Sequence, residues 1–246
     1  MKKTSSERAT IRGIVTHNGI FHADEVFATA VVMIATGVSK ENVFRTRDET
    51  HLKRARWDRE MVVLDVGGEY DPIANNFDHH QREGRPEPRS NGVPYSSLGL
   101  AWKQFGGECV VNTLLSPEVH PSGMGDVREE GSWAMLAATS SLMKSVDDGL
   151  IQGIDAADCG MVEHNTVLRG TDVSLRLVNL SGAIGSFNPG TSATDEERNN
   201  SFFSAVDFAG TFLKKEIKRT YQQKVLAPES VKKCFKRDQR LIVLEE

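Results

Sequence analysis

Histidine and aspartate residues, which commonly hold divalent metal ions, gather at four separate places in this sequence. They are His17, His22 and Asp24; Asp65; Asp78, His79 and His80; and Asp155 and Asp158. Carboxylates mixed with imidazoles suit Mn²⁺, Mg²⁺, Fe²⁺ or Zn²⁺. A carboxylate shared by two ions about 3.5–4 Å apart lets them activate a water and hold a phosphoryl oxygen. The residue types therefore indicate a phosphoesterase centre with two divalent metal ions.

Each of these groups also has an ordinary structural explanation. Two adjacent histidines are often incidental, an aspartate after a strand commonly forms a turn, and Asp24 with Glu25 could supply negative charge to a helix N-terminus. Four of the seven histidines nevertheless stand beside acids at the ends of predicted strands. Because four histidines and four aspartates share such positions, the sequence favours a metal centre.

The elements that must position these residues are predicted by short apolar runs that alternate with helical segments. The predicted strands are 12–16, 43–46, 61–65 and 75–77, and the predicted helices are 24–35, 96–105 and 131–144. This alternation predicts an α/β fold with a doubly wound, mainly parallel sheet. Ligands bind such sheets beyond the carboxyl ends of the strands, so we expect the first three groups to converge along one edge. Asp155 and Asp158 follow a long helical segment and could complete the cluster.

The second half of the chain predicts loops and one long helix. Residues 82–95 and 181–194 are rich in Pro, Gly and polar residues and are expected to be loops. The sequence Thr194-Asp-Glu-Glu has the form of a capping box, and apolar residues follow at helical spacing to about residue 226, before Pro228. The terminal RLIVLEE predicts a strand. We therefore expect a catalytic α/β domain over 1–193, a connecting helix over 194–226 and the start of an incomplete second lobe over 227–246.

Composition narrows the class of protein. The chain has 246 residues, 39% of them hydrophobic, and a formal net charge of −4, so it is globular and has no overall basic field. Residues 211–240 carry ten Lys or Arg and three acids, which indicates either a phosphate-binding face or a solvated helix surface. Three scattered cysteines without a CxxC pair favour a reducing compartment. No apolar run approaches the roughly 18 residues of a membrane span, so no membrane partner is expected.

Several ordered strings resemble a known family. Asp78-His79-His80 resembles the signature triplet of the DHH phosphoesterase superfamily, which includes RecJ-like exonucleases, oligoribonucleases and manganese pyrophosphatases. The strings THNGIFHADE, LDVGGEYDP, FDHHQR, YSSLGLAWKQFG and GIDAADCG resemble the melanocyte-proliferating-gene (MYG) exonuclease family, in order, from about residue 12 to residue 244. The resemblance implies a DHH-like fold and a 3′-to-5′ RNA exonuclease of nucleus and mitochondria. It also implies two divalent ions, Mn²⁺ or Mg²⁺.

The resemblance also implies roles for individual residues. The implied metal ligands are His17, His22, Asp24, Asp65, His79 and Asp155. Asp65 would bridge the ions, His17 and His22 would bind the first, and the remaining three would bind the second. His22 departs from the pattern, because most relatives have an aspartate there.

Three further residues lie beside these ligands in the sequence. The resemblance implies that His80 contacts the scissile phosphate and that Asp78 orients a neighbouring imidazole. Asp158 has no firm counterpart and is expected to lie outside the ligands, in hydrogen-bond contact with them.

Relatives continue into a second α/β lobe, whose start is expected here near residue 227. We therefore expect metal binding with weak or absent processive exonuclease activity. A small-molecule phosphatase or pyrophosphatase, and an inactive metal-binding module, remain alternatives. The expected location is intracellular, in the cytoplasm, the nucleus or a mitochondrion, since the N-terminus lacks the apolar core of a secretory signal. The sequence leaves the oligomeric state open.

Overall fold

The computed structural model describes residues 9–116, 132–162, 165–167, 172–176 and 178–226. Its centre is a five-stranded sheet with the order β2-β1-β3-β5-β4. The strands are β1 (Gly13–Thr16), β2 (Val43–Arg45), β3 (Met61–Leu64), β4 (Tyr70–Asp71) and β5 (Asn76–Phe77). All neighbouring pairs are parallel except β4 with β5, which is antiparallel. The predicted mainly parallel α/β sheet is confirmed.

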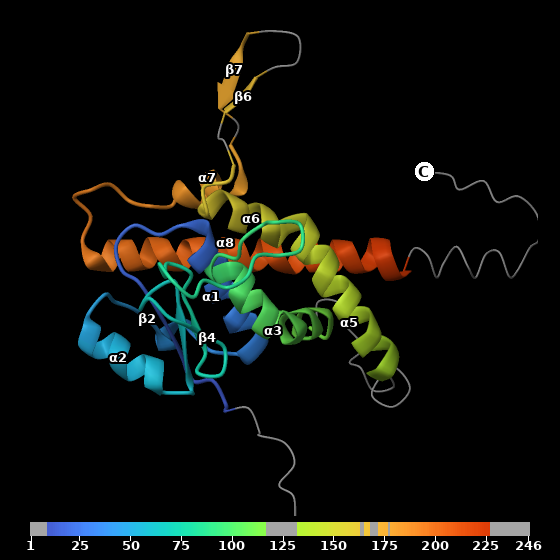
Figure 1. Cartoon of the computed structure of the whole chain (residues 1–246), viewed down its shortest axis with the longest axis horizontal. Helices are drawn as coiled ribbons and strands as arrows, with labels where there is room; N and C mark the ends of the chain where they lie inside the picture. The colour runs from blue at the N-terminus through green and yellow to red at the C-terminus, as the bar shows by residue number, and fades with distance from the viewer. Residues whose placement is uncertain (1–8, 117–131, 163–164, 168–171, 177, 227–246) are drawn as a thin grey trace, which may run out of the picture.

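Helices cover both faces of this sheet, as a doubly wound fold requires (Figure 1). On one face, α1 (Ala23–Thr36) and α3 (Ser97–Leu114) pack in the main hydrophobic core with strand residues such as Ile14 and Val62. On the other face, α2 (Glu49–Trp57) buries Leu52 and Ala55 against Val15 and Val63. Alternate strand residues therefore point to two different cores, which explains why the strands are apolar throughout.

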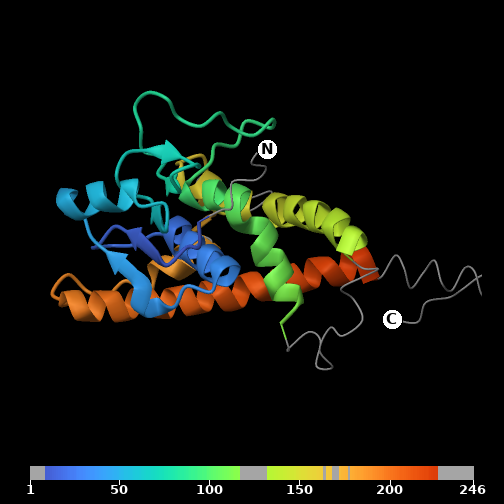
Figure 2. The same cartoon turned by 90° about the horizontal axis from the view of Figure 1, so that it is seen from below.

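The longest element is α8 (Asp195–Tyr221), which runs along the molecule beneath the sheet (Figure 2). Its predicted capping box forms, because Thr194 Oγ1 accepts from the Glu197 backbone N–H while the Glu197 carboxylate accepts from the Thr194 N–H. Its apolar stripe, including Phe202, Ala209 and Leu213, joins the main core. The long amphipathic helix is thus confirmed.

The remaining elements follow the sheet in the sequence. They are α5 (Ser132–Val146), a π-helical turn (Asp147–Ile151), α6 (Gln152–Asp158), a hairpin of β6 (Asn165–Val167) and β7 (Ser174–Arg176), and α7 (Leu180–Gly185). A short 3₁₀ turn (Lys40–Asn42) precedes β2, and a π-helical turn (Gln222–Leu226) follows α8. In Figure 1 the β6–β7 hairpin extends away from the sheet.

The structure corrects two sequence-based expectations. The loop predicted over 181–194 is partly wrong, because α7 occupies its start, with the Asn179 side chain accepting from the Gly182 N–H. Helix α2 was not predicted, because only two of its nine residues are buried and no apolar periodicity marks it. The strand predicted in RLIVLEE lies outside the described residues, and the predicted domain division stays a prediction.

Candidate metal centre

The candidate centre lies at the carboxyl edge of the sheet, where β1 and β3 run side by side. Strand order reverses here, since β1 leads through α1 to β2 on one side, and the chain then returns to β3 on the other. Such a switch point leaves a crevice beyond the strand ends. His17 directly follows β1 and Asp65 directly follows β3, and Asp65 has a positive φ of 54°. Non-glycine residues rarely adopt that conformation, and such strain is often found at functional sites.

His17 is buried between two carboxylates. Its Nε2 lies 2.9 Å from Glu25 Oε1 and 3.3 Å from Asp65 Oδ2, while its Nδ1 lies 3.0 Å from the carbonyl oxygen of Asn18. Burial alone would lower the pKa of His17, but hydrogen bonds with Asp65 and Glu25 raise it to about 10. With Nδ1–H donating to the carbonyl, Nε2 is the nitrogen that faces the carboxylates and that a metal ion would use.

His79 faces a second group of carboxylates. Its Nε2 lies 3.2 Å from Asp158 Oδ2, 3.3 Å from Asp65 Oδ1 and 3.8 Å from Asp24 Oδ2. Burial would lower the pKa of His79, but hydrogen bonds with Asp158 and Asp65 raise it to about 12. The same two imidazoles hold the pKa of Asp65 well below its usual range despite its burial. The two oxygens of Asp65 therefore point to two different imidazoles.

Asp24 is the least compensated charge at this edge. Its side chain is 0% exposed, in the first turn of α1, and neither of its oxygens accepts a hydrogen bond from the described residues. Burial raises the pKa of Asp24 well above its usual value, and the neighbouring carboxylates of Asp65 and Glu25 raise it further. The nearest basic group among the described residues is the His79 ring, whose Nε2 lies 3.8 Å from Asp24 Oδ2. A buried carboxylate without hydrogen-bond partners costs free energy unless a cation stands beside it. The donor set thus fits a metal ion.

Asp78 and His80 form a separate pair beside the centre. The Asp78 carboxylate accepts from the backbone N–H groups of Gly68 at 2.6 Å and His80 at 3.0 Å, and its Oδ1 lies 2.8 Å from His80 Nδ1. The imidazole of His80 is 62% exposed, and its Nδ1 lies 3.5 Å from Asp65 Oδ1. The hydrogen bond that the His80 ring donates to the Asp78 carboxylate raises the pKa of His80. An oriented and accessible imidazole whose protonated form is favoured suits contact with a phosphate oxygen.

The structure does not bring Asp155 to the metal-capable residues. Its Oδ1 accepts from the Ser96 hydroxyl at 2.6 Å and the Gly99 N–H at 3.0 Å, and its Oδ2 lies 2.8 Å from Arg89 Nη2. Burial raises the pKa of Asp155 to about 6, against the lowering effect of Ser96 and Arg89. Arg89 also pairs with Asp147 at 2.6 Å. The Asp155 carboxylate is therefore occupied within the protein.

In the described part of the chain, four groups place His, Cys, Asp or Glu ligand atoms within 4.8 Å of one another. They are His17, His22, Glu25 and Asp65; Asp65, His79 and His80; His79, Asp158 and Cys159; and His22, Asp24 and Asp158. The groups share members and so form one continuous centre. Five of the six predicted ligands meet here, and Asp155 does not.

Sequence reasoning missed two residues of this centre and placed a third outside the ligands. Glu25 was considered only as a charge at the helix N-terminus, but it contacts His17 and also accepts from the His22 N–H at 2.9 Å. Asp158 was expected beyond the ligands, but it reaches His79 directly. Cys159 Sγ lies 3.9 Å from His79 Nδ1. The available signal was the run of acids and histidines in FHADE and AADC, which did not reveal how each helix faces the strands.

Fold and site together define an α/β protein with a carboxylate–imidazole centre at the carboxyl edge of its sheet. The chain belongs to the MYG1_exonuc family, described as an uncharacterised protein family (UPF0160), which matches residues 13–246.

Curated relatives cover most of this chain. It is similar to the MYG1 exonuclease of Bos taurus, with 30% identity over 79% of this chain and 46% of the relative. The MYG1 exonuclease of Homo sapiens is 29% identical over 84% of this chain and 50% of the relative. The MYG1 protein C694.04c of Schizosaccharomyces pombe is 26% identical over 95% and 67%. The chain spans about half the length of the first two relatives.

No solved structure matches the chain. Within its described part, none of the helices combines the length and apolar composition that a membrane crossing requires.

Proposed function

We propose that this chain is a metal-dependent phosphodiesterase, a 3′-to-5′ RNA exonuclease that uses two divalent ions, Mn²⁺ or Mg²⁺, in a DHH-like site. The observation that carries the proposal is the wholly buried Asp24 carboxylate, which lies without a hydrogen-bond partner among other carboxylates and two imidazoles. Protein interiors rarely tolerate such a cluster unless a cation neutralises it. The printed names of the bovine and human relatives support nuclease activity.

Two ions are supported by the way Asp65 presents its oxygens. Oδ2 faces His17 at 3.3 Å, and Oδ1 faces His79 at 3.3 Å. One ion would be held by His17 and His22 and the other by Asp24 and His79, with Asp65 shared between them. We propose Asp158 in place of Asp155 for the second ion, because its carboxylate lies 3.2 Å from His79 Nε2. Glu25 would be a further ligand candidate for the first ion, because its Oε1 lies 2.9 Å from the same His17 Nε2.

The ions would supply Lewis-acid polarisation of a water and of a phosphoryl oxygen. The protein's own groups would do the rest. The Asp78 carboxylate fixes the rotation of the His80 ring, so that the exposed ring, when protonated, can donate to a phosphate oxygen on which negative charge develops. The buried position of His17 excludes water from one side of the centre. The preference for RNA and for the 3′ end rests on the family resemblance, as does a nuclear or mitochondrial location.

The test is release of mononucleotides from a short single-stranded RNA labelled at its 5′ end, with Mn²⁺ present. Asp65→Asn and His79→Ala should each lower the rate by at least about 100-fold, because they remove groups that hold the reacting centre. Asp148→Asn is the matched control, since this exposed acid pairs with Lys144 on the surface. Shortening of the labelled strand by one nucleotide at a time would show attack from the 3′ end.

Other outcomes assign a different function. Phosphate release from pyrophosphate or a nucleotide, with the RNA intact, would identify a small-molecule phosphatase. Bound metal without turnover of any phosphoester would leave a metal-binding module. Full RNA cleavage by Asp65→Asn would contradict the proposed centre altogether.

A further inference from the structure

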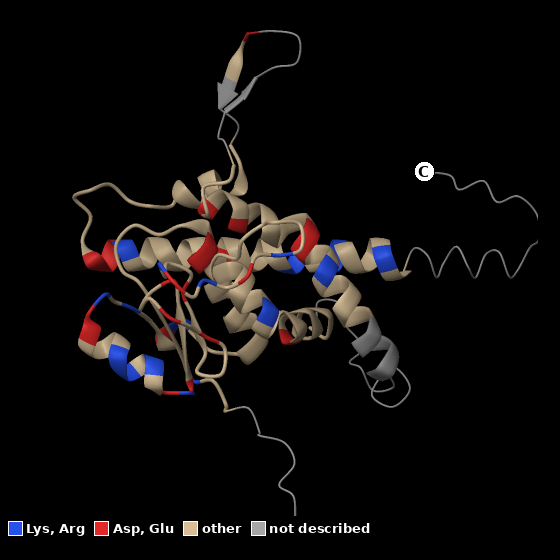
Figure 3. Ribbon diagram, in the orientation of Figure 1, with Lys and Arg blue, Asp and Glu red and all other residues tan. Residues whose placement is uncertain are grey.

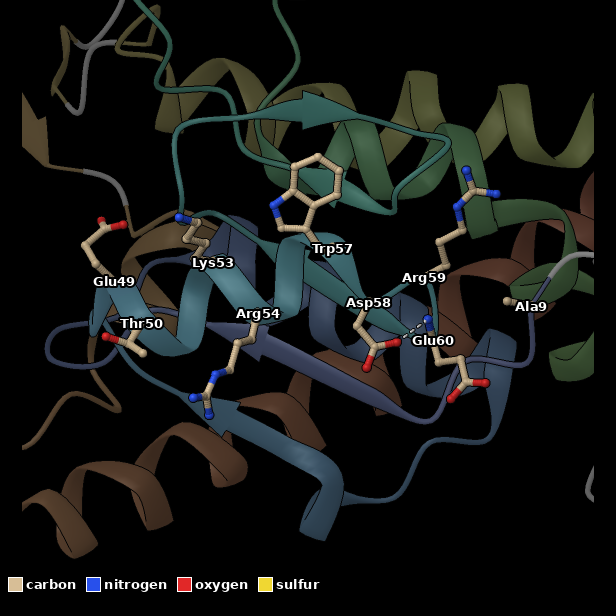
Figure 4. A pocket seen from close by; sticks show the side chains of 9 residues that line it. All are labelled: Ala9, Glu49, Thr50, Lys53, Arg54, Trp57, Asp58, Arg59 and Glu60. Carbon is tan, nitrogen blue, oxygen red and sulfur yellow. Dashed lines mark hydrogen bonds between the residues drawn. The ribbon is translucent and has the colours of Figure 1, made fainter.

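A second feature lies away from the metal centre, on the outer face of α2. An open hollow of about 1180 Å³ lies along this helix and the turn after it. Figure 4 shows the side chains that line it. Lys53, Arg54 and Trp57 project from the helix around it, and Arg59 projects from the turn. In Figure 3, basic positions in blue follow the acidic start of α2 along the helix.

Each of the three acids that line this hollow pairs with an arginine outside the lining, and Glu49 Oε2 lies 3.9 Å from Arg56 Nη2. Asp58 Oδ2 lies 2.7 Å from Arg12 Nη2, and Glu60 Oε2 lies 2.8 Å from Arg12 Nε. Within the described ranges of the chain, Lys53 and Arg54 have no ion pair, and neither has Arg59. The face therefore carries positive charge that is free to meet an anion.

The same face exposes aromatic surface. Trp57 is 83% exposed and has no ring contact with other described residues. A neighbouring hollow of about 750 Å³ shares Arg54 with the first and is lined by Phe44, which is 52% exposed. Phe44 lies on the edge strand β2, in register with Val15 of β1. It is therefore on the same face of the sheet as Val15, which α2 covers. Two large exposed aromatic rings thus lie on either side of Arg54.

We propose that Lys53, Arg54, Trp57 and Arg59 form a binding surface for single-stranded nucleic acid. An exposed indole offers a stacking surface to an unpaired base, and the cations around it bind the phosphates. Trp and Arg are also enriched at protein interfaces, but Lys53 is of a type that is depleted there, and the unpaired positive charge favours an anionic ligand.

This surface would serve the proposed exonuclease by binding its substrate, so the identity of its ligand rests on the proposed function. The start of α2 follows the carboxyl end of β2, the edge where the metal centre lies. Its nine residues rise by about 1.5 Å each, so Trp57 stands about 13 Å further along the helix. The surface would hold a strand at a distance from the end that is cleaved. Shorter oligonucleotides would then bind more weakly.

The first experiment measures binding of a labelled 12-nucleotide RNA to the full chain in EDTA by fluorescence anisotropy. Trp57→Ala should weaken binding by roughly 5- to 150-fold, the range for loss of one base–aromatic stack. Lys53→Gln with Arg54→Gln should reduce the slope of log affinity against log salt concentration by about 1.4, since each phosphate contact on a single strand contributes about 0.7.

The matched control is Lys40→Gln with Lys144→Gln, which removes the same charge elsewhere. These lysines pair with Asp207 and Asp148 on the surface. This variant should retain the parent affinity and salt slope. Thermal melting of every variant separates a binding defect from misfolding.

The second readout is indole fluorescence. Stacking should quench Trp57 when RNA is added, and the quenched signal should be missing in Trp57→Phe. Trp102 is only 2% exposed and serves as an internal reference.

Three results would overturn the proposal: parent-like affinity of Trp57→Ala, no quenching of Trp57, or equal affinity for a duplex of the same length. Capture of a protein partner through Trp57 without RNA binding would overturn it as well. Because binding is measured in EDTA, RNA binding without cleavage by the parent would refute only the proposed nuclease. An RNA cleavage rate that neither Trp57→Ala nor Lys53→Gln with Arg54→Gln changes would refute only this surface.

Discussion

At the scale of single residues, the carboxylates of the candidate centre hold two imidazoles in their protonated forms at neutral pH. The pKa of His17 is raised to about 10 and that of His79 to about 12. A divalent ion needs the same Nε2 lone pairs that carry these protons. Metal binding must therefore compete with protons, even though the carboxylates attract both.

The first prediction is that metal binding releases protons. Mn²⁺ should displace one to two protons at pH 7, so its apparent affinity should rise with pH by about tenfold per unit for each proton displaced. The sign follows from the raised pKa values, because both imidazoles stay charged until the pH approaches 10. Calorimetric titration in two buffers of different ionisation enthalpy counts the protons. An affinity that does not change between pH 6 and pH 8 would contradict this account.

The second prediction separates Asp155 from Asp158, two acids three residues apart on α6. Asp155→Asn leaves the buried Arg89 with a weakened partner and should lower the free energy of unfolding by about 3 kcal/mol, with metal affinity retained. Asp158→Asn should keep the stability and weaken metal binding by at least about tenfold. Denaturant unfolding and metal titration of both variants check this. Loss of metal by Asp155→Asn alone, in a stable protein, would restore the role that the family resemblance implies for it.

Most residues of the candidate centre could be predicted from the sequence, because they directly follow predicted strands and the ends of parallel strands lie side by side. His17 and Asp65 are each the first residue after a strand, so their convergence needs only a parallel sheet. Asp155 and Asp158 depend on how α6 is rotated about its axis. A π-helical turn over Asp147–Ile151 shifts that rotation, and no 3.6-residue pattern reveals it.

At the scale of elements, the close approach of α3 and α6 depends on a glycine. A Cβ at Gly99 would overlap Asp155 Oδ2 and lie 2.8 Å from Tyr95 Cδ1. The N-terminal end of α3 can therefore approach the Asp155 carboxylate and donate the Gly99 N–H to it. This contact also fixes the start of α6, whose last residue is Asp158.

The third prediction is that Gly99→Ala destabilises the protein by about 1–3 kcal/mol, although alanine favours helices, because the methyl group overpacks a full interior. Gly107→Ala on the same helix is the control, since its Cβ would make only an ordinary 3.6 Å contact with Met143 Sδ. That variant should be neutral or more stable by up to about 1 kcal/mol. Equal unfolding midpoints for the two variants would show that the contact at Gly99 adapts without cost.

The elements that the sequence missed are those that tertiary contacts define. Helix α2 buries only Leu52 and Ala55, and the two-residue strand β4 exists through its pairing with β5. Helix α1, by contrast, could be predicted to within a residue or two, because its apolar run ends at Gly37 in a left-handed conformation. An element can be predicted from its own sequence where that sequence contains both an apolar face for the core and a capping residue.

At the scale of the whole molecule, one main core joins the sheet to helices that are distant in sequence. Residues of α1, α3, α5 and α8 share it with residues of the sheet, and its members run from Ile11 to Ile217. The candidate metal ligands come from the ends of β1 and β3, the start of α1, the segment after β5 and the end of α6. Metal ions would therefore cross-link parts of the chain that are held together by this core.

The last prediction follows from that cross-linking. A ligand that binds only the folded state at 100 times its dissociation constant stabilises it by about 2.7 kcal/mol. For a chain of this size, each 1 kcal/mol raises the melting temperature by about 2–4 °C, so saturating Mn²⁺ should raise it by about 5–10 °C. Asp24→Asn should abolish this shift and should raise the stability of the metal-free protein, because it removes a buried carboxylate that has no hydrogen-bond partner. Asp207→Asn, on the surface, should retain the full shift. A melting temperature that Mn²⁺ leaves unchanged, or a metal-free Asp24→Asn protein less stable than its parent, would show that the Asp24 carboxylate is not a metal ligand.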